Sequence, residues 1–169
     1  MGNKKALKVV YDHKESAEYE NAYEFMNLAI QQAFMAPTVS TAFNVGSVVV
    51  VDDVVMSTGY SREHPGNTHA AEVALAKLNP QKLSHGSSLY NTMEPCSHRL
   101  SGKESCADRI IRAGVAKVYI GVKEPSTFSE CKGCQTLLDA GIDVIYMQML
   151  QERCLEPNRE LLNRNFYKQ

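Results

Sequence analysis

Three residues of this sequence, His69, Cys96 and Cys106, have side chains that commonly bind zinc. His69 lies at the start of an expected helix, Cys96 follows an expected strand, and Cys106 begins a second expected helix. Imidazole nitrogen and thiolate sulfur form tetrahedral zinc shells, and three protein ligands leave one position open for water. Zinc lowers the pKa of a bound water, so the pattern predicts Zn²⁺ as the cofactor and hydrolysis as the chemistry.

Each ligand has a plainer interpretation when it is taken alone. A single histidine is more often a surface or core residue, and a buried cysteine often packs as a small apolar side chain. The neighbouring residues favour the metal site, because Thr68 precedes His69 at a helix start and Glu94-Pro95 precedes Cys96 after a strand. Zinc-dependent nucleobase deaminases carry the pattern H-x-E … P-C-x-x-C, which this sequence matches in part.

The overall composition narrows the class of protein. The chain has 169 residues, enough for a single domain with its own core, and a net charge of -1. Without a basic excess or a basic run, a small-molecule substrate is favoured over nucleic acid. Five cysteines are an odd number for a disulfide framework, and no secretory signal or membrane-length apolar segment is visible. We therefore expect a reducing, cytoplasmic location and no membrane partner.

Apolar periodicity and turn residues divide the chain into alternating strands and helices. Helices are expected at about 16–36, 68–78 (capped by Thr68), 105–113, 134–140 and 151–166. Strands are expected at 45–51, 54–58, 89–92, 118–122 and 144–147. The alternation predicts an α/β fold with a largely parallel sheet. Residues 1–15 are expected to form an N-terminal arm and residues 16–169 one domain.

The segments around the two cysteines, Glu94-Pro-Cys-Ser-His98 and 106–115, closely resemble the pyrimidine deaminase of riboflavin biosynthesis, in the cytidine deaminase superfamily. Nine residues separate the cysteines, one more than in bacterial members, and the run Arg99-Leu-Ser-Gly102 resembles the fungal branch. The resemblance implies a three-layer α/β/α fold with a mostly parallel five-stranded sheet and a homodimer. It also implies a stand-alone deaminase that hydrolyses the ring amine of 2,5-diamino-6-(ribitylamino)-4(3H)-pyrimidinone 5′-phosphate.

One position departs from the family pattern where proton transfer is needed. The family has His-Ala-Glu, whereas this sequence reads His69-Ala70-Ala71-Glu72. The family glutamate carries a proton from the zinc water to the leaving amine. Moving it from position 71 to 72 rotates the side chain by about 100° around the helix. We interpret Ala71 as a replacement of the general acid/base, and therefore predict that zinc and substrate bind but turnover is largely abolished. In the alternative, Glu72 takes the role through a locally unwound first turn.

The resemblance also implies a set of substrate contacts. Asn44 and His64 would lie at the pyrimidine and metal side of the pocket. The loop between the cysteines would face the phosphate through Ser97, Arg99, Ser101 and Lys103. Glu124 and Ser126 stand where bacterial members have a turn that contacts the sugar chain. Each of these residues can equally be an ordinary loop residue.

Two further interpretations of the sequence stay open. Cys131-Lys-Gly-Cys134 has the spacing of half a metal or redox site, but the sequence supplies no further ligands nearby, and an incidental pair is favoured. The function also has rivals: a cytidine, deoxycytidylate or transfer-RNA adenosine deaminase, or a non-catalytic protein of the same fold. The long spacing between the cysteines and the near-neutral charge argue against the first group.

Overall fold

A mixed six-stranded sheet forms the middle layer of the molecule, in the order β1-β6-β5-β4-β2-β3. The computed structural model describes residues 5–12, 17–78, 83, 86–123 and 132–166. Its strands are β1 (Lys8–Val10), β2 (Gly46–Val51), β3 (Val54–Tyr60), β4 (Ser87–Asn91), β5 (Lys117–Ile120) and β6 (Asp143–Met147). β1, β6, β5 and β4 pair in parallel, whereas β2 is antiparallel to both β4 and β3.

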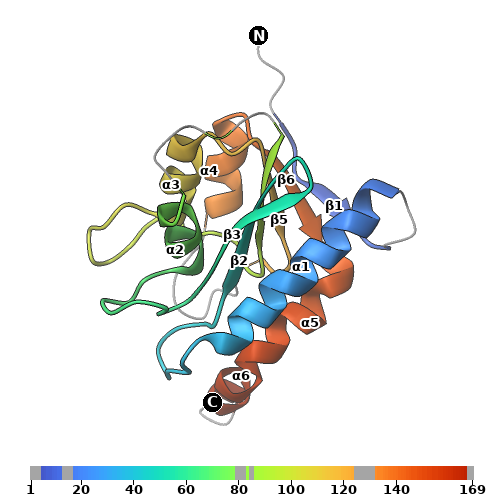
Figure 1. Cartoon of the computed structure of the whole chain (residues 1–169). Helices are drawn as coiled ribbons and strands as arrows, with labels where there is room; N and C mark the ends of the chain where they lie inside the picture. Colours follow the sequence, from blue (N-terminus) through green and yellow to red (C-terminus); the bar gives the residue numbers. More distant parts are fainter. Residues whose placement is uncertain (1–4, 13–16, 79–82, 84–85, 124–131, 167–169) are drawn as a thin grey trace.

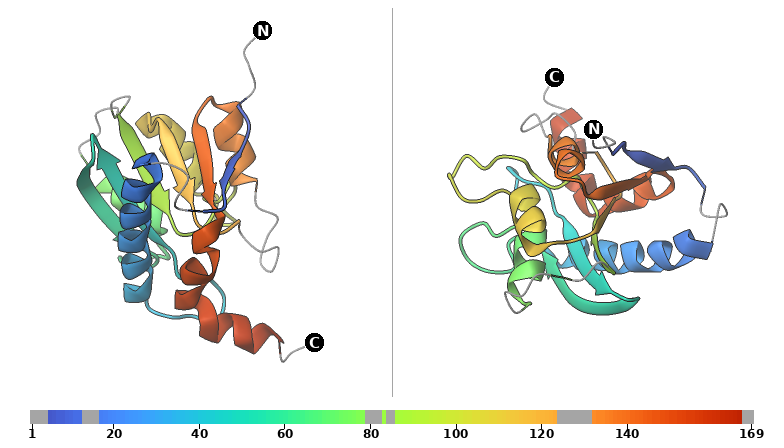
Figure 2. Two further views of the ribbon diagram at one scale, coloured as in Figure 1. Left: turned by 90° about the vertical axis from the view of Figure 1, so that its right-hand side faces the viewer. Right: turned by 90° about the horizontal axis from the view of Figure 1, so that it is seen from above.

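Helices cover both faces of this sheet (Figures 1 and 2). One face carries α1 (Ala17–Met35), α5 (Gln151–Leu155) and α6 (Arg159–Phe166), with 3₁₀ turns η2 (Gln148–Leu150) and η3 (Glu156–Asn158) around α5. The other face carries α2 (Ala70–Ala76), α3 (Cys106–Ala113) and α4 (Gly133–Asp139). The architecture is therefore the three-layer α/β/α arrangement that the sequence resemblance implied.

Alternating strand residues divide the core into two clusters. Val48 and Val50 of β2 pack with α1, while Val49 between them packs with α2 and α3. In β4, Tyr90 and Leu89 divide in the same way. Side chains of a strand point alternately to its two faces, so a nearly continuous apolar strand is what a sheet covered on both sides requires.

The structure adds one strand to the five that were expected. Residues 8–10, within the segment predicted to be an arm, form β1 and extend the parallel part of the sheet beside β6. Lys8 is exposed, Val9 is partly buried and Val10 is fully buried. Three residues with one buried position are too short to show a strand period in the sequence.

The cap of α2 also differs from the sequence prediction. His69, not Thr68, is the N-cap residue, with extended backbone angles and no side-chain cap hydrogen bond. The Thr68 hydroxyl instead accepts from the His64 backbone N–H at 3.2 Å and donates to the His64 carbonyl at 3.1 Å. Thr68 therefore holds the loop 64–68 closed, and His69 follows it as the N-cap residue of α2.

In the described part of the chain, no helix is both long enough and apolar enough to cross a bilayer.

Helix α2 lies directly on β3, and Gly59 permits this approach. A Cβ atom at Gly59 would lie 2.5 Å from the Ala70 carbonyl oxygen and 2.7 Å from the Ala74 backbone nitrogen. Both atoms belong to the helix backbone, which cannot move aside as a flexible side chain can. Gly59 thus sets the distance between the sheet and the helix that follows His69.

We predict that Gly59→Ala lowers the free energy of unfolding by about 1–3 kcal/mol, because overpacking displaces α2. Gly141→Asn is a suitable control: Gly141 has φ +84° and nothing within 4 Å of an added Cβ, and asparagine tolerates this conformation. Urea unfolding followed by circular dichroism measures both variants. A Gly59→Ala midpoint equal to that of the wild type would contradict the packing argument.

Candidate metal centre and cavity

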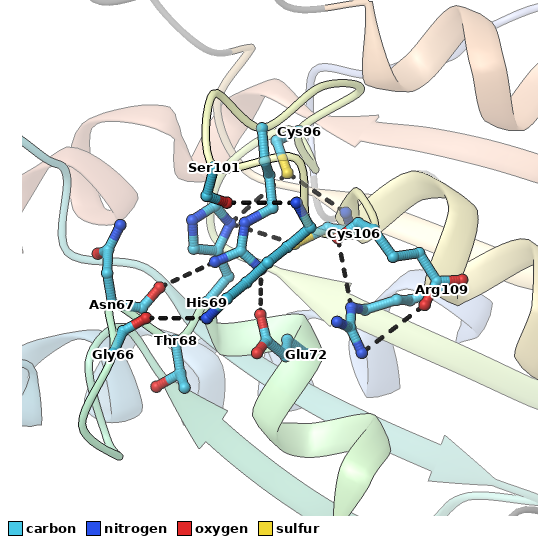
Figure 3. A network of polar contacts seen from close by, with 12 residues as sticks. Gly66, Asn67, Thr68, His69, Glu72, Cys96, Ser101, Cys106 and Arg109 are labelled. Atoms are coloured by element: carbon cyan, nitrogen blue, oxygen red, sulfur yellow. Dashed lines mark hydrogen bonds and ion pairs between the residues drawn. The ribbon is translucent and has the colours of Figure 1, made fainter.

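His69, Cys96 and Cys106 meet at one point on the helical face that carries α2 and α3 (Figure 3). His69 Nδ1 lies 3.5 Å from Cys96 Sγ and 3.4 Å from Cys106 Sγ. All three ligand atoms lie within 4.8 Å of one another. In a tetrahedral zinc site with Zn–S of about 2.3 Å and Zn–N of about 2.0–2.1 Å, the nitrogen–sulfur separation is about 3.6 Å. The three side chains are therefore spaced as zinc ligands.

The helix α3 and the chain before it hold the two cysteines together. Ser105 caps α3, accepting at its hydroxyl from the Asp108 backbone N–H at 3.1 Å. The Ala107 N–H donates to the Cys96 carbonyl at 3.0 Å, and the Cys106 N–H donates to Cys96 Sγ at 3.3 Å. The first turn of α3 thus binds the segment that carries Cys96, which fixes one sulfur beside the other.

The pKa values of the two cysteines are shifted in opposite directions. The hydrogen bond with Cys106, followed by that with His69, lowers the pKa of Cys96 to about 4, although burial opposes this shift. The same hydrogen bond to Cys96 and nearly complete burial raise the pKa of Cys106. Cys96 is consequently the more acidic thiol of the pair, and a thiolate is the form that binds metal.

The three ligands lie at one end of a cavity of about 140 Å³. Its wall is formed by loop 41–45, by the segment 61–71 that leads into α2, and by the end of β4. The lining residues are Thr41, Ala42, Phe43, Val45, Ser61, Arg62, Asn67, His69, Ala70, Ala71, Asn91, Met93, Glu94, Pro95, Cys96 and Cys106. A cavity beside three ligands of a four-coordinate metal can admit a small organic substrate to the fourth position.

Positions 71 and 72 face different surroundings. Ala71 is buried and lines the cavity beside His69. Glu72 does not line the cavity, and its carboxylate forms an ion pair with Arg99. Burial alone would raise the pKa of Glu72, but its hydrogen bond with Arg99 and the guanidinium charge outweigh it and lower that pKa. A carboxylate held ionised in this way is a poor proton donor.

The predicted phosphate-facing residues differ in their surroundings. Arg99 is buried and donates to the Asn67 carbonyl at 3.0 Å, in addition to its ion pair with Glu72. The Ser97 hydroxyl accepts from the Lys132 N–H at 3.2 Å. Ser101 and Lys103 are exposed, and Lys103 Nζ donates to the Gly66 carbonyl at 3.3 Å.

The predicted pyrimidine-side residues are not among those lining the described cavity. Asn44 is buried, and its amide binds Thr38, Pro157 and Arg62. His64 is largely exposed, near Glu63. Glu124 and Ser126 lie outside the described residues, as does Cys131.

Arg62, Asn91 and Glu94 line the cavity but were missed in the sequence. Arg62 has φ +60° and donates to the Pro37 and Phe43 carbonyl oxygens, which joins two loops of the wall. Asn91 donates to the Met93 carbonyl at 2.7 Å, while its buried Oδ1 has no hydrogen-bond partner in the described part of the chain. Arg62 follows the end of β3, and Asn91 and Glu94 lie at or after the end of β4. This position could have indicated them in the sequence, because loops at strand ends commonly form binding sites.

Glu94 is the one carboxylate among the lining residues of the described chain. Its Oε2 accepts from the Cys134 backbone N–H at 2.9 Å at the start of α4. A Cβ at Gly133 would lie 1.6 Å from the Pro95 carbonyl oxygen, so α4 packs directly on the segment before Cys96. Cys134 is thus explained by packing, and Cys154 is buried on the opposite face of the sheet.

Comparison with known proteins accounts for this centre. Residues 19–122, which include all three ligands, match the family described as the cytidine and deoxycytidylate deaminase zinc-binding region. This chain belongs to that deaminase family. The match confirms the family that the cysteine segments predicted, and with it zinc as the cofactor that the three ligands fit.

Individual relatives within the deaminase family act in riboflavin biosynthesis. A diaminohydroxyphosphoribosylamino-pyrimidine deaminase of Schizosaccharomyces pombe is 44% identical over 138 residues, which cover 80% of this chain and 34% of that protein. The riboflavin biosynthesis protein RibD of Escherichia coli is 36% identical over 125 residues, covering 74% of this chain and 31% of its own length. The chain therefore spans about a third of the curated relatives it matches.

A solved deaminase structure has the same architecture. The Rib2 deaminase of Aspergillus oryzae, a C-terminal deletion mutant in complex with DARIPP, matches with a TM-score of 0.71 and 34% identity. The match covers 81% of this chain and 89% of that chain. The chain is therefore similar in fold to that Rib2 deaminase over most of both chains.

We predict that Cys96→Ser and Cys106→Ser each lose stoichiometric zinc, because either change removes one of three protein ligands. Cys154→Ala is the control, since this cysteine is buried like Cys106 but packs on the other face of the sheet. Metal analysis after dialysis measures the zinc content. Full zinc retention in Cys106→Ser would contradict the assignment of this ligand.

Proposed function

We propose that this chain binds Zn²⁺ through His69, Cys96 and Cys106 and recognises 2,5-diamino-6-(ribitylamino)-4(3H)-pyrimidinone 5′-phosphate in its cavity. The parent activity is hydrolysis of the ring amino group with release of ammonia. The observation that carries the proposal is the cavity that has the three ligands at one end and Ala71 beside them. Bound zinc would activate water for attack on the carbon that bears the amine.

The cavity wall offers polar side chains to a substrate ring. Arg62, Asn67 and Asn91 are among the lining residues, and loop 41–45 lies on the same wall. Lys103 is exposed on the loop between the cysteines, and its ammonium group, which donates to the Gly66 carbonyl, would also bind the phosphate. Arg99 is committed to Glu72, so we assign phosphate binding to Lys103 rather than to Arg99.

We further infer that turnover is largely abolished in the chain as it stands. Proton transfer requires a group within hydrogen-bond reach of the reacting atoms. Ala71 offers none, and Glu72 is ion-paired outside the cavity. Glu94 lines the cavity, but its carboxylate binds the start of α4. The chain therefore retains the metal and binding residues without a group that moves the proton.

We propose a homodimer from the sequence resemblance. We propose a cytoplasmic location because the two cysteines of the metal centre are free thiols. Thiols that serve as metal ligands require a reducing compartment. Size-exclusion chromatography with light scattering measures the assembly directly.

We predict that Ala71→Glu raises the rate of ammonia release by about 10²–10⁴-fold, because it restores a proton-transferring carboxylate in the cavity. The measurement is ammonia release from the pyrimidine phosphate by zinc-loaded protein, with cytidine and deoxycytidylate as competing substrates.

Ala71→Gln is the matched control, since it adds nearly the same volume but cannot transfer a proton. The account requires no gain from glutamine. Equal rates for the wild type and Ala71→Glu would contradict the assignment of position 71. A preference for deoxycytidylate over the pyrimidine phosphate would instead favour a nucleotide deaminase activity.

A further inference from the structure

A buried ion pair joins the loop between the cysteines (97–105) to the helix that follows His69. The Arg99 side chain is 5% exposed and that of Glu72 is 14% exposed. Ion pairs on the surface of this chain are much more open, such as Arg164 with Glu160, whose side chains are both above 60% exposed. A buried pair depends on its exact partners, because either charge alone would lack compensation.

Arg99 contacts the chain on both sides of His69. One guanidinium nitrogen donates to the Glu72 carboxylate, three residues after the histidine. A second donates to the Asn67 carbonyl at 3.0 Å, two residues before it. The network is shown in Figure 3, where Asn67 and Glu72 lie on either side of His69. A single side chain of the loop thus spans the segment that presents the imidazole.

Glu72 lies in the first turn of α2, which directly follows His69. Its ion pair with Arg99 therefore joins the loop between the cysteines to the helix end that carries the histidine. The pair carries no net charge, so its main effect on a metal centre is geometric.

We propose that Glu72 and Arg99 are positioning residues that hold the loop between the cysteines against the His69 segment and thereby keep the three ligands at zinc-binding distance. The pair lies outside the cavity wall and acts through the ligands. The inference rests on the zinc binding of the proposed function and is independent of turnover and substrate.

The test is zinc affinity, measured by competition with a chromogenic chelator on the full chain. We expect Glu72→Gln and Arg99→Met each to weaken zinc binding by about 10–100-fold, as is usual for partners that orient metal ligands. The double variant should be about as weak as either single variant, because both changes break the same contact. Glu160→Gln and Arg164→Met, at the exposed pair, should change the affinity by less than about twofold.

Two measurements separate positioning from simple loss of fold. Circular dichroism of each metal-free variant reports the folded fraction, and Co²⁺ substitution reports the ligand geometry through its visible spectrum. For a variant that does not fold, Arg99→Lys, which keeps the charge but not the two-sided contact, takes its place with an expected loss of about 3–30-fold.

Zinc affinity that is unchanged in folded Glu72→Gln and Arg99→Met would overturn the proposal, and so would strictly additive losses in the double variant. These outcomes are read without substrate. If zinc binding behaves as expected while Ala71→Glu remains inactive, the proposed deaminase activity fails and the positioning role stands.

Discussion

The structure depends on bringing three ligands from separate segments within 4.8 Å of one another. Two short backbone contacts make this possible. Helix α2 sits against β3 because Gly59 has no side chain, and the first turn of α3 binds the Cys96 carbonyl through the Ala107 N–H. Both helices pack on the same apolar face of the sheet, so the core that stabilises the fold also fixes the metal centre.

The centre retains its metal ligands and its cavity but lacks a proton-transferring group at position 71. In the sulfur pair, hydrogen bonding lowers the pKa of Cys96, and that of Cys106 is raised. The cavity is formed, and Asn91 is among its lining residues. The centre departs from the family pattern His-Ala-Glu at a single position. Ala71 lies on the cavity wall in place of the glutamate, and the next residue, Glu72, pairs with Arg99. In the account proposed here, binding and proton transfer are separable properties of this fold.

Much of this could be predicted from the sequence, for identifiable reasons. Ligand type and spacing indicated the metal centre, and residues such as Gly114 marked the helix end at which the structure has φ +77°. Strand β1 could not be predicted, because three residues carry no usable period. Asn44 was predicted to face the pyrimidine, yet the structure turns its amide to Pro157, 113 residues away in the chain. Contacts of this range are set by packing and leave no local signal. The pairing of Arg99 with Glu72 is of the same kind.

The central claim is that the chain holds zinc and substrate but does not turn the substrate over. The most direct measurement is a calorimetric titration of the zinc-loaded protein with the ribitylamino-pyrimidinone phosphate, with ammonia assayed in the same sample. The account predicts saturable binding at one site per chain, dependent on the cavity, with ammonia release near the uncatalysed rate. Rapid ammonia release, or the absence of binding by zinc-loaded protein, would contradict it.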